Sequence, residues 1–265
     1  MSEIKVNKIS PRSGTDVTLG DSGDTFTLPT GVTLDTSNST VTLPDGSVTN
    51  AKISDSTIEL AKLSATGTKD ATTFLRGDNT FVAVSSDFVK LASGSFSSNT
   101  LSFDGYFTSD YSHYKIILTD VIPSVSNGNI GMRIRQSNAD VTTSDYQNVG
   151  QHGAIQIGVT GTNGTSIAEN TNYFDLQQGY AVANVSNLSM NAEVTLFNVL
   201  NTSLYKHYHY KSSQHYTSAV SGGYWVTSTG GGNYDGNTNA LSGFTIMTNS
   251  GNITSGNCYL YGVKG

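Results

Sequence analysis

The segment Ala192-Glu193-Val194-Thr195-Leu196 alternates strictly between apolar and polar residues. A period of two predicts a β-strand with one buried face, because successive side chains of a strand point to opposite sides. Five further segments have the same texture: residues 114–118, 130–134, 154–157, 244–246 and 259–263.

Turn-forming residues separate these segments, as in Ser126-Asn127-Gly128-Asn129 and Thr162-Asn163-Gly164. No long stretch has a helical period. About ten short strands over roughly 180 residues predict an all-β fold, in which residues 85–265 form a two-sheet β-sandwich of jelly-roll type.

Two pairs of short repeats precede the sandwich. Val48-Thr49-Asn50-Ala51-Lys52-Ile53-Ser54 is followed ten residues on by Ile58-Glu59-Leu60-Ala61-Lys62-Leu63-Ser64, and Thr25-Phe26-Thr27-Leu28-Pro29-Thr30-Gly31 matches Thr40-Val41-Thr42-Leu43-Pro44-Asp45-Gly46. Each copy of the second pair predicts a short strand closed by a Pro-x-Gly turn. Identical chains are the obvious partners for such exposed strand edges. We therefore expect a thin, intertwined shaft over residues 21–84, including a connector, after an arm at residues 1–20.

The composition argues against some classes of function. Only 13% of residues are charged and the net charge is −6, which argues against nucleic-acid binding, since that needs clustered Lys and Arg. No apolar stretch is long enough to span a membrane, and residues 1–8 lack a hydrophobic leader. We expect assembly in a cytoplasm. The single cysteine, Cys258, cannot form an intrachain disulfide and is expected to be buried.

Several segments resemble tail-fibre proteins of tailed bacteriophages. The two Ala-Lys-(Ile/Leu)-Ser units and Thr72-Thr73-Phe74-Leu75-Arg76-Gly77-Asp78-Asn79-Thr80-Phe81 are similar to a shaft-to-knob region. Residues 4–9 through 20–26 look like the start of marine-phage fibres, and residues 251–264 are similar to the last hairpin of their β-sandwich knobs. Together these segments cover roughly half of the chain.

The resemblance implies a virion tail fibre: a homotrimer, fixed at its N-terminus to the virion tail or an adaptor protein, whose distal knob adsorbs to a host-surface glycan or protein. In the arm, Ile4, Val6 and Ile9 are the candidates for attachment. The resemblance transfers no receptor-binding residue.

The candidate receptor site comes from an aromatic cluster in a Ser-, Asn-, Gln- and Gly-rich window. Aromatic rings stack on sugar faces, and amide and hydroxyl groups bond sugar hydroxyls. The alternative is that about half of these rings fill the core or a subunit interface. The candidates are Tyr205, Tyr208, Tyr210, Tyr216, Tyr224, Trp225 and Tyr234.

Three other motifs have structural alternatives that we favour. His207 and His209 point the same way in a strand and could bind a transition metal, or simply line a polar, aromatic face. Residues 233–239 alternate oxygen-bearing side chains, as a calcium loop does, but lack its distal glutamate, so we expect an exposed loop. Arg76-Gly77-Asp78 is the integrin tripeptide and is expected to be a turn that opens a strand.

No catalytic motif or cofactor site stands out, and we expect no enzyme activity. Two alternatives to receptor recognition stay open. One is a purely structural virion spike or adaptor that carries another receptor-binding protein. The other is a glycan depolymerase, which would need two facing carboxylates; beyond Asp87 the chain has two glutamates, Glu169 and Glu193, and scattered aspartates that could supply such a pair.

Overall fold

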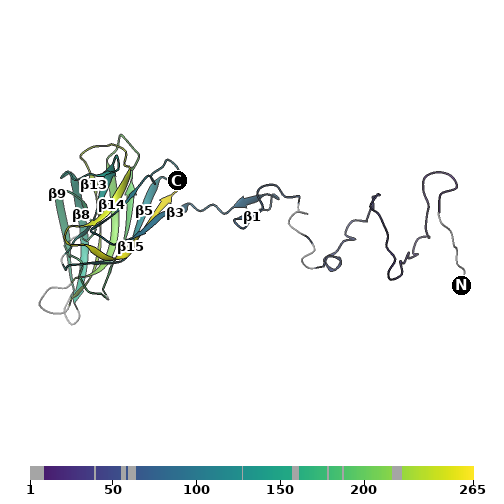
Figure 1. Cartoon of the computed structure of the whole chain (residues 1–265), viewed down its shortest axis with the longest axis horizontal. Coiled ribbons are helices and arrows are strands. Elements are labelled where there is room, and N and C mark those ends of the chain that lie inside the picture. Colours follow the sequence, from purple (N-terminus) through teal and green to yellow (C-terminus); the bar gives the residue numbers. More distant parts are fainter. Residues whose placement is uncertain are drawn as a thin grey trace. The chain divides into compact units, whose positions relative to one another are not determined.

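The computed structural model describes residues 9–38, 40–54, 58, 64–126, 128–156, 161–177, 179–186, 188–216 and 223–265. The chain divides into two compact units, residues 1–83 and 84–265. The boundary is one residue from the one expected between shaft and knob. Figure 1 shows both units, of which the C-terminal one holds most of the strands.

The C-terminal unit is all-β, as predicted, and every strand pairing in it is antiparallel. Its larger sheet has eight strands, in the order β3-β15-β5-β11-β12-β13-β8-β9. Figure 1 shows β9 and β8 on one side of this unit and β3 on the other. The bounds are β3 Phe88–Ser95, β5 His113–Pro123, β8 Tyr146–Gln156, β9 Thr162–Thr171, β11 Met190–Phe197, β12 Lys206–Tyr216, β13 Tyr224–Tyr234 and β15 Ile253–Val263.

The smaller sheet has five strands, in the order β10-β6-β14-β4 with β7 paired to β6. The bounds are β4 Thr100–Asp104, β6 Ile130–Gln136, β7 Ala139–Asp140, β10 Phe174–Asp175 and β14 Gly243–Thr248. Pairing is nested along the chain: β5 pairs with β15, β6 with β14, β8 with β13 and β11 with β12. Strands early in the sequence therefore pair with strands late in the sequence, and the larger sheet is complete only when β15 has paired with β3 and β5.

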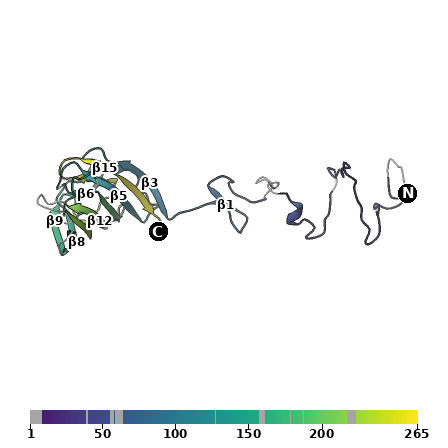
Figure 2. The same cartoon turned by 90° about the horizontal axis from the view of Figure 1, so that it is seen from below.

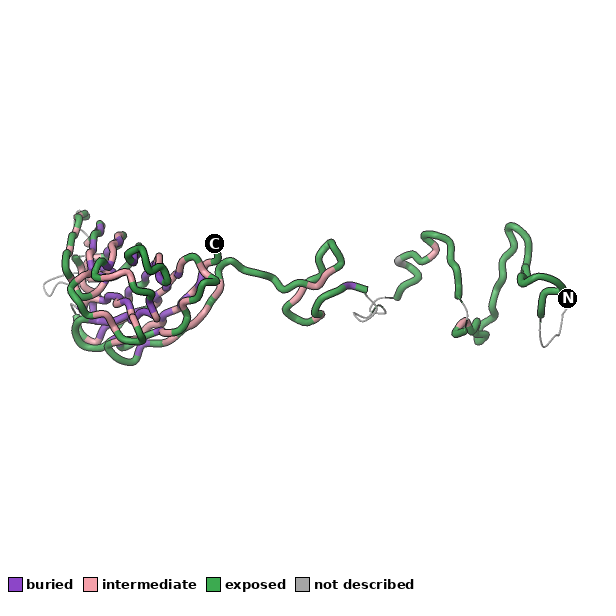
Figure 3. The backbone as a smooth tube through the Cα atoms, turned by 90° about the horizontal axis from the view of Figure 1, so that it is seen from above, coloured by how far each residue is buried: buried purple, intermediate pink, exposed green. Residues whose placement is uncertain are grey.

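The two sheets pack face to face around one apolar core (Figure 2), an arrangement consistent with a β-sandwich. Phe174 of the smaller sheet stacks on Tyr208 of the larger one, with ring centroids 4.1 Å apart, and contacts Tyr146 edge-on at 4.8 Å. Phe103 and Phe244 extend this core along the smaller sheet. Figure 3 shows the buried residues gathered in this unit.

The alternation in the sequence predicted strands correctly at all six segments, as far as they are described. Ala192, Val194 and Leu196 are buried, and so is Cys258. Two details differ. Residues 162–164 were expected to form a turn but begin β9. In β15 the buried apolar side chains are Ile253, Cys258 and Leu260, whereas the tyrosines on either side of Leu260 lie on the outer face.

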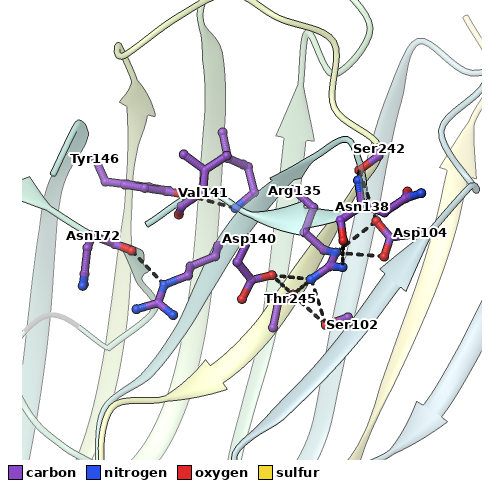
Figure 4. Close-up of polar contacts among 12 residues, drawn as sticks. Ser102, Asp104, Arg135, Asn138, Asp140, Val141, Tyr146, Asn172, Ser242 and Thr245 are labelled. Carbon is purple, nitrogen blue, oxygen red and sulfur yellow. Dashed lines mark hydrogen bonds and ion pairs between the residues drawn. The ribbon is translucent and has the colours of Figure 1, made fainter. Parts of the chain in front are cut away.

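An arginine network fixes the short β7 strand to the smaller sheet (Figure 4). Arg135 Nε donates to Asp104 Oδ2 at 2.8 Å, and its Nη1 forms an ion pair with Asp140. Thr245 donates its hydroxyl to the same Asp140 carboxylate at 2.6 Å. All three charged side chains are largely buried. The guanidinium therefore holds β4, β6 and β7 together.

Buried tyrosines make the fold sensitive to alkali. Burial raises the pKa of Tyr146, Tyr208 and Tyr210 above the ordinary value of 10.0. The folded chain then binds more protons than the unfolded chain above pH 10, so stability is complete below pH 10 and is lost as the pH rises further. We expect the tyrosinate absorbance of these three buried rings, the last to ionise in an alkaline titration, to appear together with loss of circular dichroism. Full ionisation of all tyrosines in an intact fold would contradict this.

The N-terminal unit has little regular structure over its described residues. A 3₁₀ turn spans Asn50–Lys52, and one hairpin joins β1 (Thr73–Leu75) to β2 (Phe81–Ala83). Both predicted Pro-x-Gly turns form: Val32 N donates to Pro29 O and Ser47 N to Pro44 O, each at 3.1 Å. The strands predicted before these turns do not form in the single chain, which offers them no ladder partner.

Nearly every described residue of the N-terminal unit is exposed or half-buried (Figure 3). Its large apolar side chains are exposed too, namely Ile9, Val17, Leu19, Phe26, Leu28, Val32, Leu34, Val41, Leu43, Val48, Ile53, Ile58, Phe74, Leu75 and Val82. Ile4, Val6 and most of residues 55–63, including much of the second Ala-Lys repeat, lie outside the described residues. Across the part of the chain that is described, no helix has the length and apolar character needed to cross a membrane.

Candidate functional site

The eight-stranded sheet has a long hollow on its outer face, the face turned away from the smaller sheet. One part, about 650 Å³, lies over β11, β12, β13 and β8, and a second, about 830 Å³, continues it toward β9. The two parts share Gln151, Thr165, Lys211 and Thr229. A third part, about 340 Å³, extends to Trp225. We call this continuous hollow the outer groove.

Glycines create the floor of the outer groove. In β13, Gly230 and Gly232 leave room on the inner side for the rings of Tyr210 and Tyr208; a Cβ on Gly230 would lie 2.7 Å from Tyr210 Cε1. Gly231 faces outward, and a Cβ there would lie 2.8 Å from His209 Cδ2. The three consecutive glycines thus allow the tyrosines to pack closely on the inner face of β13, and they leave the outer groove free of side chains on the other face.

Gly153 of β8 is the position in the floor with free space next to it. A Cβ built there would meet only Thr227 Oγ1, at 3.9 Å. A larger side chain at this position can therefore project into the outer groove without colliding with the backbone.

The lining of the outer groove is polar but nearly uncharged. Hydroxyl and amide side chains predominate, from Gln151, Asn163, Thr165, Ser213, Thr227 and Thr229. The charged residues Glu193 and Lys211 lie directly opposite each other in the β11–β12 register, and Glu193 also pairs with Lys115. Such a surface offers many hydrogen-bond donors and acceptors without a strong electrostatic field.

Trp225 stands at one end of the outer groove and is half exposed. Its ring meets His215 edge-on at 5.0 Å, and its neighbour across the strands is the exposed Ile155. In the strand register Trp225 lies opposite His215 of β12. Phe88, near the start of this unit, corresponds through the registers of β15, β5 and β11 to His207 of β12. At 3.3 Å per residue these two positions are about 25 Å apart along the strands. Trp225 is thus at the end of the sheet away from the chain's point of entry.

The predicted aromatic cluster divides into buried and accessible members. Tyr208, Tyr210 and Tyr234 are at most 2% exposed and belong to the core, so proposing them as receptor contacts was wrong. They occupy inward positions of β12 and β13, and Tyr208 Oη donates to Asn148 Oδ1 at 2.7 Å. Tyr205 is exposed, but it precedes β12 at the opposite end from Trp225.

Tyr216 and Tyr224 are half-buried and pair across β12 and β13. Both rings contact Tyr180, at centroid distances of 5.3 and 6.2 Å. Tyr180 was missed by the sequence reasoning because it lies in an irregular segment, outside the window of clustered tyrosines. These three rings and Trp225 make this end of the sheet rich in aromatic surface.

His207 and His209 lie on the outer face together, as the strand geometry predicted. His209 meets the ring of Phe197 edge-on at 5.4 Å, and Phe197 stacks on His113. Within the described residues no cluster of three His, Cys, Asp or Glu side chains is arranged to hold a metal ion. Both histidines line one end of the outer groove.

Of the other two motifs, residues 233–239 form a loop only from Asp235 onward, because Asn233 and the buried Tyr234 end β13. Asn237, in the predicted exposed loop, accepts from Gln136 Nε2 at 2.8 Å and donates to Tyr234 Oη at 3.1 Å. Arg76-Gly77-Asp78 forms the turn between β1 and β2, as expected. The Arg76 and Asp78 side chains contact each other at 3.5 Å.

Comparison with protein-family models, with curated proteins and with solved structures found no match. The candidate site therefore rests on its own geometry. It has a glycine floor, a lining of hydroxyl and amide groups, and an exposed indole at one end.

Proposed function

We propose that this protein is a trimeric virion tail-fibre protein whose C-terminal unit, a jelly-roll-like sandwich, recognises a neutral glycan on the host surface. The observation that carries the proposal is the outer groove, which combines uncharged hydrogen-bonding side chains with the exposed ring of Trp225. Sugar rings present an apolar face for an indole and a rim of hydroxyls for amide and hydroxyl partners. The nested strand pairing supports the jelly-roll description.

The exposed apolar side chains of the N-terminal unit support an assembly, because an interface between chains would cover them.

The position of Trp225 also fits a fibre. A receptor-binding surface is most useful at the end of the sheet away from Phe88, because the chain enters from the shaft side. Three copies would gain avidity of order 10²–10⁴ on a repeating receptor. Attachment to the virion is assigned to the arm, in which Ile9 is exposed.

We assign no reaction to the outer groove. Glu193 lies on β11 and Glu169 on β9, with three strands between them. At about 4.8 Å per strand spacing they are roughly 19 Å apart, well beyond the separation of glycosidase carboxylates. The two glutamates therefore do not form a glycosidase pair, and among the described residues Glu193 supplies the one carboxylate that lines the outer groove.

Glycan-array binding by the full-length protein tests the proposal. Gly153→Leu fills the groove floor without a backbone clash and is expected to weaken binding at least tenfold. Ser93→Leu, at an exposed position on β3 of the same sheet, is the matched control and is expected to bind as the wild type does. Equal binding by both variants would place the receptor site elsewhere. Release of reducing sugar would instead indicate a depolymerase, and failure to bind any glycan would favour a structural spike.

A further inference from the structure

Two pairs of exposed apolar side chains flank the polar part of the outer groove. Trp225 and Ile155 lie opposite each other in the β13–β8 register and are 50% and 56% exposed. Val149 and Ile167 lie opposite each other in the β8–β9 register and are 50% and 68% exposed. We call them the first and the second apolar pair. Trp225 and Ile155 line one part of the outer groove, and Val149 lines another.

These side chains are not scattered over the surface. Among the described strands of the C-terminal unit, the large aliphatic side chains that are exposed are Val149, Ile155 and Ile167. All three face outward from β8 and β9, which Figure 1 shows next to each other at one side of the unit. Single exposed apolar residues need no explanation, but apolar side chains gathered along one groove mark a contact surface.

Polar residues separate the two apolar pairs. Gln151 and Gly153 lie between Val149 and Ile155 on the same face of β8, and two threonines of β13 lie opposite them. Val149 and Ile155 are six residues apart, which corresponds to about 20 Å along the strand. One sugar residue is too short to contact both pairs. A ligand that contacts both is therefore an extended oligosaccharide, whose middle part meets hydrogen-bonding groups.

The two apolar pairs offer different chemistry. The indole of Trp225 presents a flat face on which a sugar ring can stack. Val149 and Ile167 are aliphatic, so they gain from contact with apolar carbon atoms rather than from stacking. Gly231 lies opposite Val149 and also lines the outer groove, which leaves the Val149 side chain open toward the floor. In a neutral sugar the group that fits is a methyl group, carried by a deoxy sugar or by an acetyl substituent.

We infer that the outer groove selects an extended neutral oligosaccharide that reaches both apolar pairs and places a methyl-bearing sugar, deoxygenated or acetylated, against Val149 and Ile167. The inference rests on the proposed function and names the class of glycan. Trp225 stacks on a sugar ring at one end, and Gln151 with the threonines beside it binds hydroxyl groups in the middle.

Glycan-array binding by the full-length protein tests the inference on neutral glycans printed in two versions. One version carries the methyl group of a deoxy sugar or an acetyl substituent, and the other carries a free hydroxyl group there. The wild type is expected to bind longer oligosaccharides better than mono- and disaccharides. It is also expected to bind the methyl-bearing version roughly fourfold more tightly for each methyl group buried.

The double variant Val149→Thr, Ile167→Thr removes the second apolar pair. Threonine keeps a branched side chain that favours strands but replaces apolar carbon by a hydroxyl group. The double variant is expected to keep the wild-type circular dichroism and to bind both versions of each glycan equally. Val125→Thr changes an exposed valine outside the strands. It is the matched control and should keep the preference of the wild type.

The outcomes distinguish this inference from the proposed function. A wild type that binds both versions equally, or a double variant that keeps the preference, would overturn the inference and leave recognition in the outer groove standing. A smaller assembly of the double variant in sedimentation equilibrium would assign Val149 and Ile167 to a contact between chains and would also overturn it. Failure of the wild type to bind any glycan would overturn the proposed function, and the inference with it.

Discussion

Replacing Arg135 with Met is expected to lower the free energy of unfolding of the C-terminal unit by about 3–5 kcal/mol. The guanidinium binds Asp104 and Asp140 and also donates to Asn138 O. Met fills much of the same volume but leaves two carboxylates close together and largely buried without a counter-charge. That cost, rather than the loss of an attractive pair, gives the large effect.

Thermal unfolding measures the effect of Arg135→Met. For a unit of this size a loss of 3–5 kcal/mol corresponds to a fall in Tm of roughly 6–20 °C. Arg133→Met is the matched control, since Arg133 is on the same strand but its Nε donates to a single carbonyl, that of Asn172, at 3.0 Å (Figure 4). The control is expected to cost about 1 kcal/mol or less. Equal losses in the two variants would show that leaving Asp104 and Asp140 without a counter-charge carries no extra cost.

Replacing Tyr208 with Ala is expected to cost about 3–5 kcal/mol as well, because the ring is fully buried between the sheets. It stacks on Phe174 at 4.1 Å and lies against the Gly232 backbone. The change also removes the hydroxyl that Asn148 Oδ1 accepts. A cavity would remain in the middle of the core, while Asn148 Oδ1 would still accept from Asp175 N at 2.9 Å.

Trp225→Ala removes a half-exposed ring, whereas Tyr208→Ala removes a buried one. Half of its ring is exposed, so we expect a loss of about 1 kcal/mol or less together with a loss of glycan binding of at least tenfold. Denaturant unfolding and glycan-array binding, both measured on these two variants, separate a role in stability from a role in binding. If Trp225→Ala unfolds the protein and surviving folded molecules still bind, the indole belongs to the core and the proposed site is wrong.

The strands could be predicted because a period of two needs only local sequence. The same periodicity divides β12, where His207, His209 and Lys211 face outward and Tyr208 and Tyr210 face inward. Reading that division would have removed the buried tyrosines from the candidate site. Clustering along the sequence was the misleading signal, because it does not say whether the tyrosines of a strand face the core or the solvent.

The outer groove could not be predicted from local sequence. Its lining comes from β8, β9, β11, β12 and β13, whose order in the sheet depends on pairings distant along the chain. The one local signal was the run Gly230-Gly231-Gly232 inside a strand, which indicates a close approach of other groups. The shaft strands were predicted from the same alternation, but a strand forms only where another strand can pair with it.

The single tryptophan provides the most direct test of the central claim, that a neutral glycan binds in the outer groove. Trp225 is the only tryptophan of the chain and is half exposed at the end of the groove. Titration of the full-length protein with a glycan that it binds on the array is expected to shift the emission to shorter wavelength and to protect the indole from iodide, saturably and with the same Kd as binding. Saturable binding with unchanged emission and unchanged quenching would contradict the account.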